Sequence, residues 1–361
     1  MSASFKDFRS STTKDGRFIL CASQSEDHFT SLTAVLRGVL VMHGLRYPAD
    51  IISATSGDCF ALQFNPNLFM SGLCGISEHF TTGLAELGIQ ATLYAQNTEE
   101  DIIRLATSIK ASLFKQQIVL VFGGWPPLSL GERDNYWGIL HSPGPERGKY
   151  LGNTMRDTLN ISLASEDLVW PHYTNSPFAA FGIEKSPAPI RRESRKVRLV
   201  LQRGLELLRG LAPDDDLHQY DELFTWLMQE DITPSAGQYP AWPFPGRVAI
   251  RCQLETISRY LTYAISVVPA RKRRLMKQVH EIASLMAQKL LQTEPLRTYP
   301  RKPSKPVKSV TSPWAQDAWT QVWQALQDVN GEARQKEITL MQELQKDHKK
   351  LIEILAELVT D

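Results

Sequence analysis

The sequence predicts an α+β protein in which the first half mixes helices with short strands and the second half is helical. Two observations support this prediction. In the first half, short β-branched runs such as Ile118–Phe122 alternate with segments of helical periodicity. After a stretch rich in proline and aromatic residues, Trp170–Pro189, the sequence changes to long amphipathic repeats that begin with Arg191–Gly210.

The first half opens on a predicted helix. Apolar residues recur at helical spacing from Leu32 to His43, and Gly44 is a typical residue for ending such a helix. The other elements that we predict here are helices at Ile76–Leu87 and Glu99–Phe114 and strands at Phe18–Ala22, Asp58–Phe64, Gln90–Tyr94, Ile118–Phe122, Tyr136–Leu140 and Lys149–Leu151.

The second half is predicted to contain only helices. We place them at Arg191–Gly210, Tyr220–Met228, Ala249–Val268 and Ala270–Thr293, followed by a C-terminal helical region. An apolar stripe from Ile338 to Leu358 favours packing on the protein's own helices over a coiled coil. The predicted organisation is therefore a flexible tail (1–17), an α+β domain (18–185), a helical domain (186–299), a Lys/Pro-rich linker (300–313) and C-terminal helices (314–361).

Composition excludes several classes of protein. Forty basic and 39 acidic residues in a chain of 361 give a net charge of +1, so we do not expect a nucleic-acid-binding protein. Four cysteines, Cys21, Cys59, Cys74 and Cys252, form no metal-binding or disulfide pattern. No apolar run approaches the ~20 residues that span a bilayer. We expect a cytoplasmic protein without a membrane span, metal or cofactor.

The order of elements in residues 18–165 resembles the papain-like fold of the C39 peptidase and BtrH-type families, here in a bacterial branch with a helical C-terminal half. The segments that carry this resemblance are Ser56–Leu62, Val119–Trp125, Tyr136–Leu140 and Tyr150–Asn153. BtrH-type proteins are acyl-transfer enzymes or their relatives in antibiotic biosynthesis. The resemblance therefore implies a papain-like (C39-type) N-terminal domain with a cleft beside the helix that starts near Ser31.

The same resemblance assigns catalytic positions, and two of them are substituted. Gln24 matches the oxyanion donor. The nucleophile position holds Thr30, or Ser31 if the register shifts by one, and the histidine position holds Asn135 or Tyr136. A hydroxyl is a weaker nucleophile than a thiolate, and neither Asn nor Tyr acts as a base near pH 7. The residue that orients the histidine would lie near Asn153 or Asp157.

Four other residues are candidates for the cleft, each with a structural alternative. His28 could be a displaced base, or a histidine that caps a helix. Cys59 could be a displaced nucleophile, but its apolar neighbours favour a buried thiol. His141 could reach the cleft from the far end of its strand, although a hydrogen-bonded strand-end histidine is the favoured interpretation. Trp125 could form a ligand lip or a buried turn.

These observations lead to two functional hypotheses. The first is a non-catalytic binding or scaffolding protein, a pseudoenzyme whose cleft holds a peptide or small metabolite and whose C-terminal helices contact a protein partner or a second copy. The alternative is an acyltransferase or amide hydrolase with a displaced nucleophile at Cys59, Ser31 or Thr30. Nucleic-acid binding through the basic clusters at Arg191–Lys196 and Arg271–Arg274 is a third hypothesis, which we set below a solvated helix face.

Overall fold

In a computed structural model of the protein, the chain divides into two compact units. The first comprises residues 1–58 and 72–191, and the second comprises residues 59–71 and 192–361. The structure describes residues 11–12, 18–19, 31–62, 64, 78–96, 102–122, 137–144, 149–154, 162–165, 179–210, 218–230, 232, 246–292 and 324–360.

The first unit is built on a six-stranded antiparallel sheet with the order β3-β8-β4-β5-β6-β7. Its strands are β3 (Ile89–Gln96), β4 (Ile118–Phe122), β5 (Trp137–Pro143), β6 (Lys149–Thr154), β7 (Ser162–Ser165) and β8 (Ala179–Lys185). The helices are α1 (Ser31–Met42), α2 (Ala49–Ser56), α3 (Glu78–Glu86) and α4 (Ile102–Phe114). Mixed helix and antiparallel sheet confirm the α+β class, and the predicted strand at Ile118–Phe122 is confirmed at both ends.

Strand β8 lies between β3 and β4 and was not predicted from the sequence. No strand was predicted in the stretch Trp170–Pro189, yet Ala179–Lys185 forms an inner strand of the sheet. Residues 179–183 are all buried, but they read Ala-Ala-Phe-Gly-Ile, and alanine and glycine are weak strand formers. Tertiary pairing on both edges compensates for this weak local preference.

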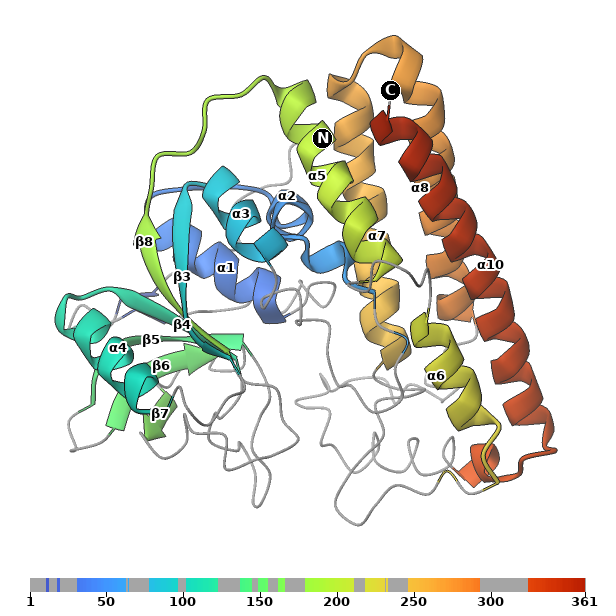
Figure 1. The fold of residues 1–361 in the computed structure, drawn as a ribbon, viewed down its shortest axis with the longest axis horizontal. Coiled ribbons are helices and arrows are strands. Elements are labelled where there is room, and N and C mark those ends of the chain that lie inside the picture. The colour runs from blue at the N-terminus through green and yellow to red at the C-terminus, as the bar shows by residue number, and fades with distance from the viewer. Residues whose placement is uncertain are drawn as a thin grey trace. The chain divides into compact units, whose positions relative to one another are not determined.

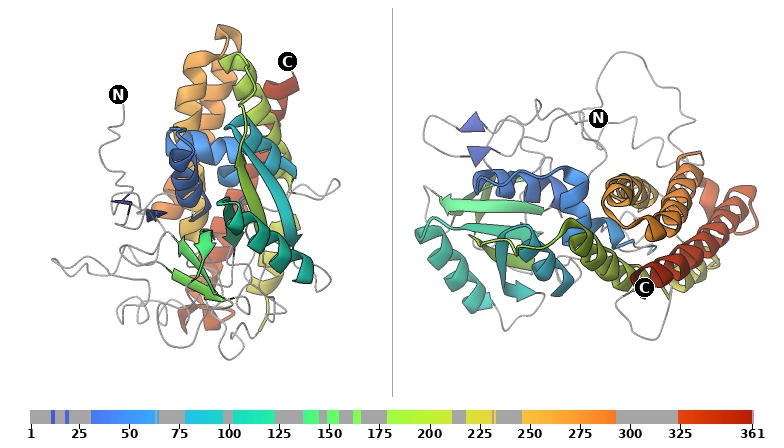
Figure 2. Two further views of the ribbon diagram at one scale, coloured as in Figure 1. Left: turned by 90° about the vertical axis from the view of Figure 1, so that its left-hand side faces the viewer. Right: turned by 90° about the horizontal axis from the view of Figure 1, so that it is seen from above.

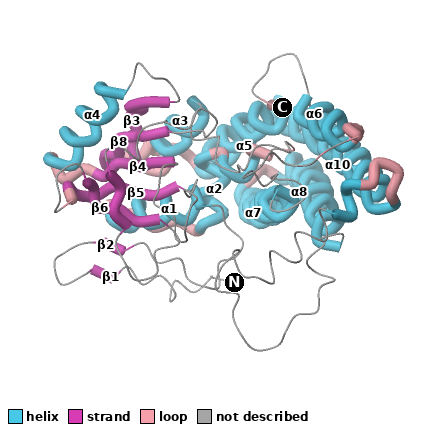
Figure 3. Tube along the Cα trace, turned by 90° about the horizontal axis from the view of Figure 1, so that it is seen from below, coloured by secondary structure: helices cyan, strands magenta, loops and turns pink. Residues whose placement is uncertain are grey.

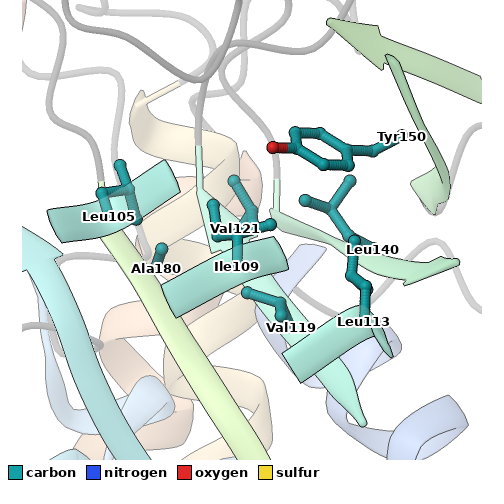
Figure 4. Close-up of a cluster of buried hydrophobic side chains, with 8 residues drawn as sticks. All are labelled: Leu105, Ile109, Leu113, Val119, Val121, Leu140, Tyr150 and Ala180. Carbon is teal, nitrogen blue, oxygen red and sulfur yellow. The ribbon is translucent and has the colours of Figure 1, made fainter. Parts of the chain in front are cut away.

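Helix α4 covers one face of the sheet (Figure 4). Its apolar residues pack on alternate side chains of four strands, and Tyr94 borders this cluster and bonds the Ser112 hydroxyl at 2.6 Å. The cluster consists of Leu105, Ile109, Leu113, Val119, Val121, Leu140, Tyr150 and Ala180. A β-carbon at Gly182 would lie 1.8 Å from the Tyr94 hydroxyl oxygen, so the tyrosine requires glycine at this position.

Helices α1 and α3 lie on the opposite face of the sheet (Figure 3). Phe80 of α3 packs against Trp137 and Phe181, with ring centroids 6.0 and 5.2 Å away. Helix α1 contacts β5 and α2, and it buries Leu32, Val35, Leu36, Val39 and Leu40. The predicted helix from Leu32 is therefore confirmed, and Gly44, with φ of +76°, lies in the turn that follows it.

Two predictions for the first unit are wrong. The N-terminal tail contains a strand, because β1 (Ser11–Thr12) pairs with β2 (Phe18–Ile19). The predicted strand Asp58–Phe64 begins as a 3-10 turn at Asp58–Phe60 and forms no described ladder. Phe60, Leu62 and Phe64 are buried together with Cys59 and Ala61, so the alternation in the sequence does not correspond to two faces of a strand.

The second unit is helical, as predicted. Its helices are α5 (Glu193–Arg209), α6 (His218–Leu227), α7 (Gly246–Val267), α8 (Ala270–Gln292) and α10 (Glu332–Thr360). Helices α7 and α8 form a pair interrupted at Pro269, and α10 packs along α8 and α5 (Figure 2). Most of the stripe on α10, from Met341 to Leu358, is buried within the chain, which agrees with packing on the protein's own helices.

The segment 59–71 joins the helical unit, whereas a single boundary near 185–186 was predicted. Phe60 lies on the backbone of α5, where a β-carbon at Gly204 would come within 2.9 Å of its ring. Gln253 of α7 donates to the Ala61 carbonyl at 3.0 Å. Large apolar side chains from the first half of the sequence thus complete the core of the second unit. The predicted linker 300–313 lies outside the described residues.

Arg334, at the start of α10, is fully buried and bonds only backbone carbonyls. It donates to the carbonyls of Leu227, the last residue of α6, at 3.3 Å and of Gln229 at 2.6 Å. It also donates to the carbonyls of Leu326 and Gln327, which end the helical turn at 324–327. Helix C-terminal carbonyls lack intrahelical donors, so one guanidinium satisfies two helix ends.

None of the described helices has both the length and the hydropathy needed to cross a membrane.

His348 lies at the centre of the second unit and is fully buried. Its Nδ1 is 3.4 Å from the Tyr220 hydroxyl, and Tyr220 stacks on Phe64 with centroids 4.1 Å apart. Burial lowers the pKa of His348 to about 4, although a hydrogen bond to the Leu208 backbone opposes this shift. The imidazole is therefore neutral in the folded protein at neutral pH.

We predict that Arg334→Met lowers the free energy of unfolding by about 3 kcal/mol, because several buried carbonyls lose their donor. Urea unfolding followed by circular dichroism measures this loss. Lys336→Met, on the exposed side of the same helix, serves as the matched control and should leave the midpoint unchanged. Equal midpoints for both variants would show that other donors replace the guanidinium.

We also predict an acid-sensitive component of stability from His348. In the unfolded chain this histidine titrates near 6.5, whereas in the folded protein its pKa is about 4. The unfolded state therefore binds more protons as pH falls from 6.5 toward 4, and stability is lost across this window. The loss between pH 7.5 and pH 5 should be about 2 kcal/mol. His348→Leu should lack this component, and Met341→Leu on the same helix should retain it. The same pH dependence in both variants would contradict the prediction.

Candidate functional site

The candidate site lies where α1 faces strands β5 and β6. Helix α1 begins at Ser31, and β5 begins at Trp137, directly after the predicted histidine position. The two elements are in contact. Antiparallel pairing then places β6 beside β5, with Asn153 opposite Ile139. Segments far apart in the sequence thus supply one helix and two strands to the same surface.

Asn153 is the main polar residue that the described strands bring to this surface. Tyr150 and Leu140 belong to the cluster under α4, so alternation along β6 directs Asn153 toward the opposite face, where α1 lies. The residue is fully buried. Neither its carboxamide oxygen nor its nitrogen has a hydrogen-bond partner among the described residues.

Such a carboxamide has a clear chemical capacity. It offers two N–H donors and one oxygen acceptor, and it carries no charge that would need a counterion. Burying these groups without a partner lowers the stability of the folded protein, unless the amide finds a partner at the surface under α1. Asn153 is also one of the two residues, with Asp157, near which the family resemblance would place the group that orients the histidine.

A buried carboxylate that the sequence did not reveal anchors α1. Asp58 is fully buried and accepts hydrogen bonds from Thr33 of α1 at 2.7 Å and from Ser53 of α2 at 3.4 Å. Ser56 donates to the Ser53 carbonyl at 3.1 Å. Helix α3 reinforces this region, since a β-carbon at Gly83 would lie 2.1 Å from the Thr55 carbonyl oxygen. The orientation of α1 is thus set by hydrogen bonds as well as by apolar packing.

Most predicted site residues fall outside the described residues. These are Gln24, His28, Thr30, Trp125, Asn135, Tyr136 and Asp157. Ser31 is the first residue of α1, at the end of the helix where the nucleophile position was expected. Of the positions assigned from the family resemblance, the structure therefore places Ser31 and Asn153.

Cys59 does not line a cleft, and its assignment as a cleft residue is corrected. The thiol is fully buried and belongs to the second unit, where it lies near the phenol of Tyr260. Reactive thiols are partly exposed and lie in electropositive surroundings, whereas buried thiols are inert. This placement agrees with the buried-thiol alternative and argues against Cys59 as a displaced nucleophile.

His141 lies in β5 but far from the start of that strand. It is the extra residue of a β-bulge, because pairing with β6 shifts between Leu140 and Ser142. Its Nδ1 is 3.1 Å from the Ser142 hydroxyl. Four residues along a strand span about 13 Å, so His141 is well separated from Trp137. A hydrogen-bonded histidine at a strand end is what the structure shows.

Among the residues that the structure describes, no three His, Cys, Asp or Glu side chains are grouped so that they could hold an ion. No protein-family model and no curated protein matches the chain.

We predict that Asn153→Leu leaves the free energy of unfolding unchanged or raises it by about 1 kcal/mol, because an apolar side chain of similar size replaces a buried amide without a described partner. Urea unfolding measures the change. Thr154→Val, which alters the next residue and the opposite face of β6, is the control. A loss above about 2 kcal/mol for Asn153→Leu alone would show that structural hydrogen bonds hold the amide.

Proposed function

We propose that the first unit is a papain-like domain that binds a peptide or small metabolite beside the N-terminal end of α1 and does not perform the papain reaction. The observation that carries this proposal is Asn153. It is a buried carboxamide without a described partner, and it lies on the face of the sheet where α1 lies. The family resemblance would place the orienting residue near Asn153 or Asp157. A group of this kind can donate to a ligand carbonyl and accept from a ligand amide.

The order of elements supports the papain-like assignment. A helix that begins at the expected nucleophile position packs on the strand that follows the expected histidine position, and the next strand carries Asn153. The residue types argue against the reaction, because Thr30 or Ser31 replaces the thiol and Asn135 or Tyr136 replaces the base. Loss of either member of such a pair removes most of its catalytic advantage.

The proposal is tested by binding and reactivity in parallel. We would screen peptides and small metabolites for those that raise the melting temperature of the wild-type protein, and titrate the hits by calorimetry. Asn153→Leu should weaken the binding of these ligands by at least about tenfold, which corresponds to the loss of one or two buried hydrogen bonds. Thr154→Val should bind them as the wild type does.

Reactivity separates this proposal from the enzymatic alternative. Fluorophosphonate and iodoacetamide probes should label none of Thr30, Ser31 and Cys59 in the native protein. The protein should not hydrolyse p-nitrophenyl acetate faster than buffer alone does. Stoichiometric labelling of Thr30 or Ser31, together with turnover that Thr30→Ala or Ser31→Ala abolishes, would establish an acyl-transfer enzyme and overturn the non-catalytic assignment.

A further inference from the structure

Two basic segments of the sequence meet at one end of the helical unit. Arg198, in the second turn of α5, donates to the Val359 carbonyl at 3.1 Å. Lys272, in the first turn of α8, donates to the Leu358 carbonyl at 2.9 Å. Both carbonyls belong to the last turn of α10, so the starts of α5 and α8 lie together around the end of α10 (Figure 1).

The cations at this end form two regular rows. On α5, Arg192, Arg195 and Arg198 recur every three residues and are exposed. On α8, a row with the same spacing runs through Arg271, Arg274 and Lys277, and it is also exposed. Neighbours at this spacing on a helix are about 5–6 Å apart. With Lys196, Lys272 and Arg273, these residues make up the surface that we call the basic end.

Acidic groups only partly neutralise the basic end. Glu193 bonds Tyr263 at 2.6 Å and Lys196 at 2.9 Å, and these hydrogen bonds lower its pKa. Two further carboxylates, Glu353 and Glu357, are exposed on the last turns of α10. Nine cations therefore stand against three described carboxylates. The side chains of the four arginines at 192, 195, 271 and 274 make no ion pair or hydrogen bond with the described residues.

We propose that the basic end binds the phosphate backbone of a nucleic acid. Six of its nine cations are arginines, which bind phosphate through two parallel hydrogen bonds. Two evenly spaced rows suit a polymer with regularly spaced anions better than an acidic protein surface, where carboxylates have no fixed spacing. Binding of this kind depends on charge, reads no base sequence and weakens steeply with salt. This proposal does not depend on the proposed ligand site beside α1.

The proposal is tested with the full-length protein and a fluorescently labelled 20-base-pair DNA duplex, with an RNA duplex of the same sequence in parallel. If the basic end contacts about four phosphates, affinity measured by anisotropy should fall on the order of 100-fold between 50 and 200 mM salt. Changing Arg192, Arg195, Arg271 and Arg274 together to Gln should weaken binding at least tenfold at 100 mM salt and flatten the salt dependence.

The matched control changes four other exposed cations, Lys110, Lys115, Lys349 and Lys350, to Gln and removes the same total charge. This variant should bind like the wild type. The double variant Arg271→Gln/Arg274→Gln should be intermediate, which keeps the test valid if the quadruple variant loses its melting transition. Equal binding by the arginine variants and the lysine control, or no binding by the wild type at 50 mM salt, would overturn the proposal. So would selective binding to polyglutamate or to phosphatidylserine vesicles.

Discussion

Side-chain alternation along β6 decides what the first unit presents to α1. Leu140 and Tyr150 join the apolar cluster under α4, and this placement commits Asn153 to the opposite face. A slip of one residue between β5 and β6 would move the carboxamide into that apolar cluster and turn Tyr150 toward α1, so burial on both faces enforces the register. The extra residue of the bulge, His141, is on β5, so the residues of β6 pair consecutively and their side chains alternate regularly. The proposed ligand site depends on this one alignment.

The buried polar groups Asp58, Arg334 and Asn153 differ in whether they have hydrogen-bond partners among the described residues. Asp58 joins two helices through Thr33 and Ser53, and Arg334 satisfies the carbonyls of two helix ends. Each of these groups is matched by partners on elements that it holds together, as expected for polar groups kept for stability. Asn153 has the same degree of burial but no described partner. This contrast is the reason why the proposed ligand site is placed at the surface under α1.

Charge is unevenly distributed in a chain that is nearly neutral overall. The carboxylates of Asp221 and Glu222 in α6 and of Glu230 shortly after it are exposed, and this region contains no lysine or arginine. The basic end, by contrast, contains nine cations. A net charge of +1 is a sum over the whole chain and does not reveal such local clusters of charge. The sequence shows each basic cluster on its own amphipathic helix, where a solvated face is the simplest interpretation. The hydrogen bonds to the last turn of α10 combine them into one surface.

The sequence by itself determined the elements whose signal is local. Apolar residues at helical spacing predicted α1, α5, α8 and the packing of α10, and a β-branched run predicted β4, because these patterns reflect burial within one segment. It also pointed to the neighbourhood of Asn153 through a family resemblance. Only the tertiary structure decided the rest. Strand β8 forms from alanine and glycine because both of its edges are paired, and Cys59, Phe60 and Phe64 are buried in the helical unit although they come from the first half of the sequence. Such outcomes depend on contacts between distant segments, which no local pattern encodes.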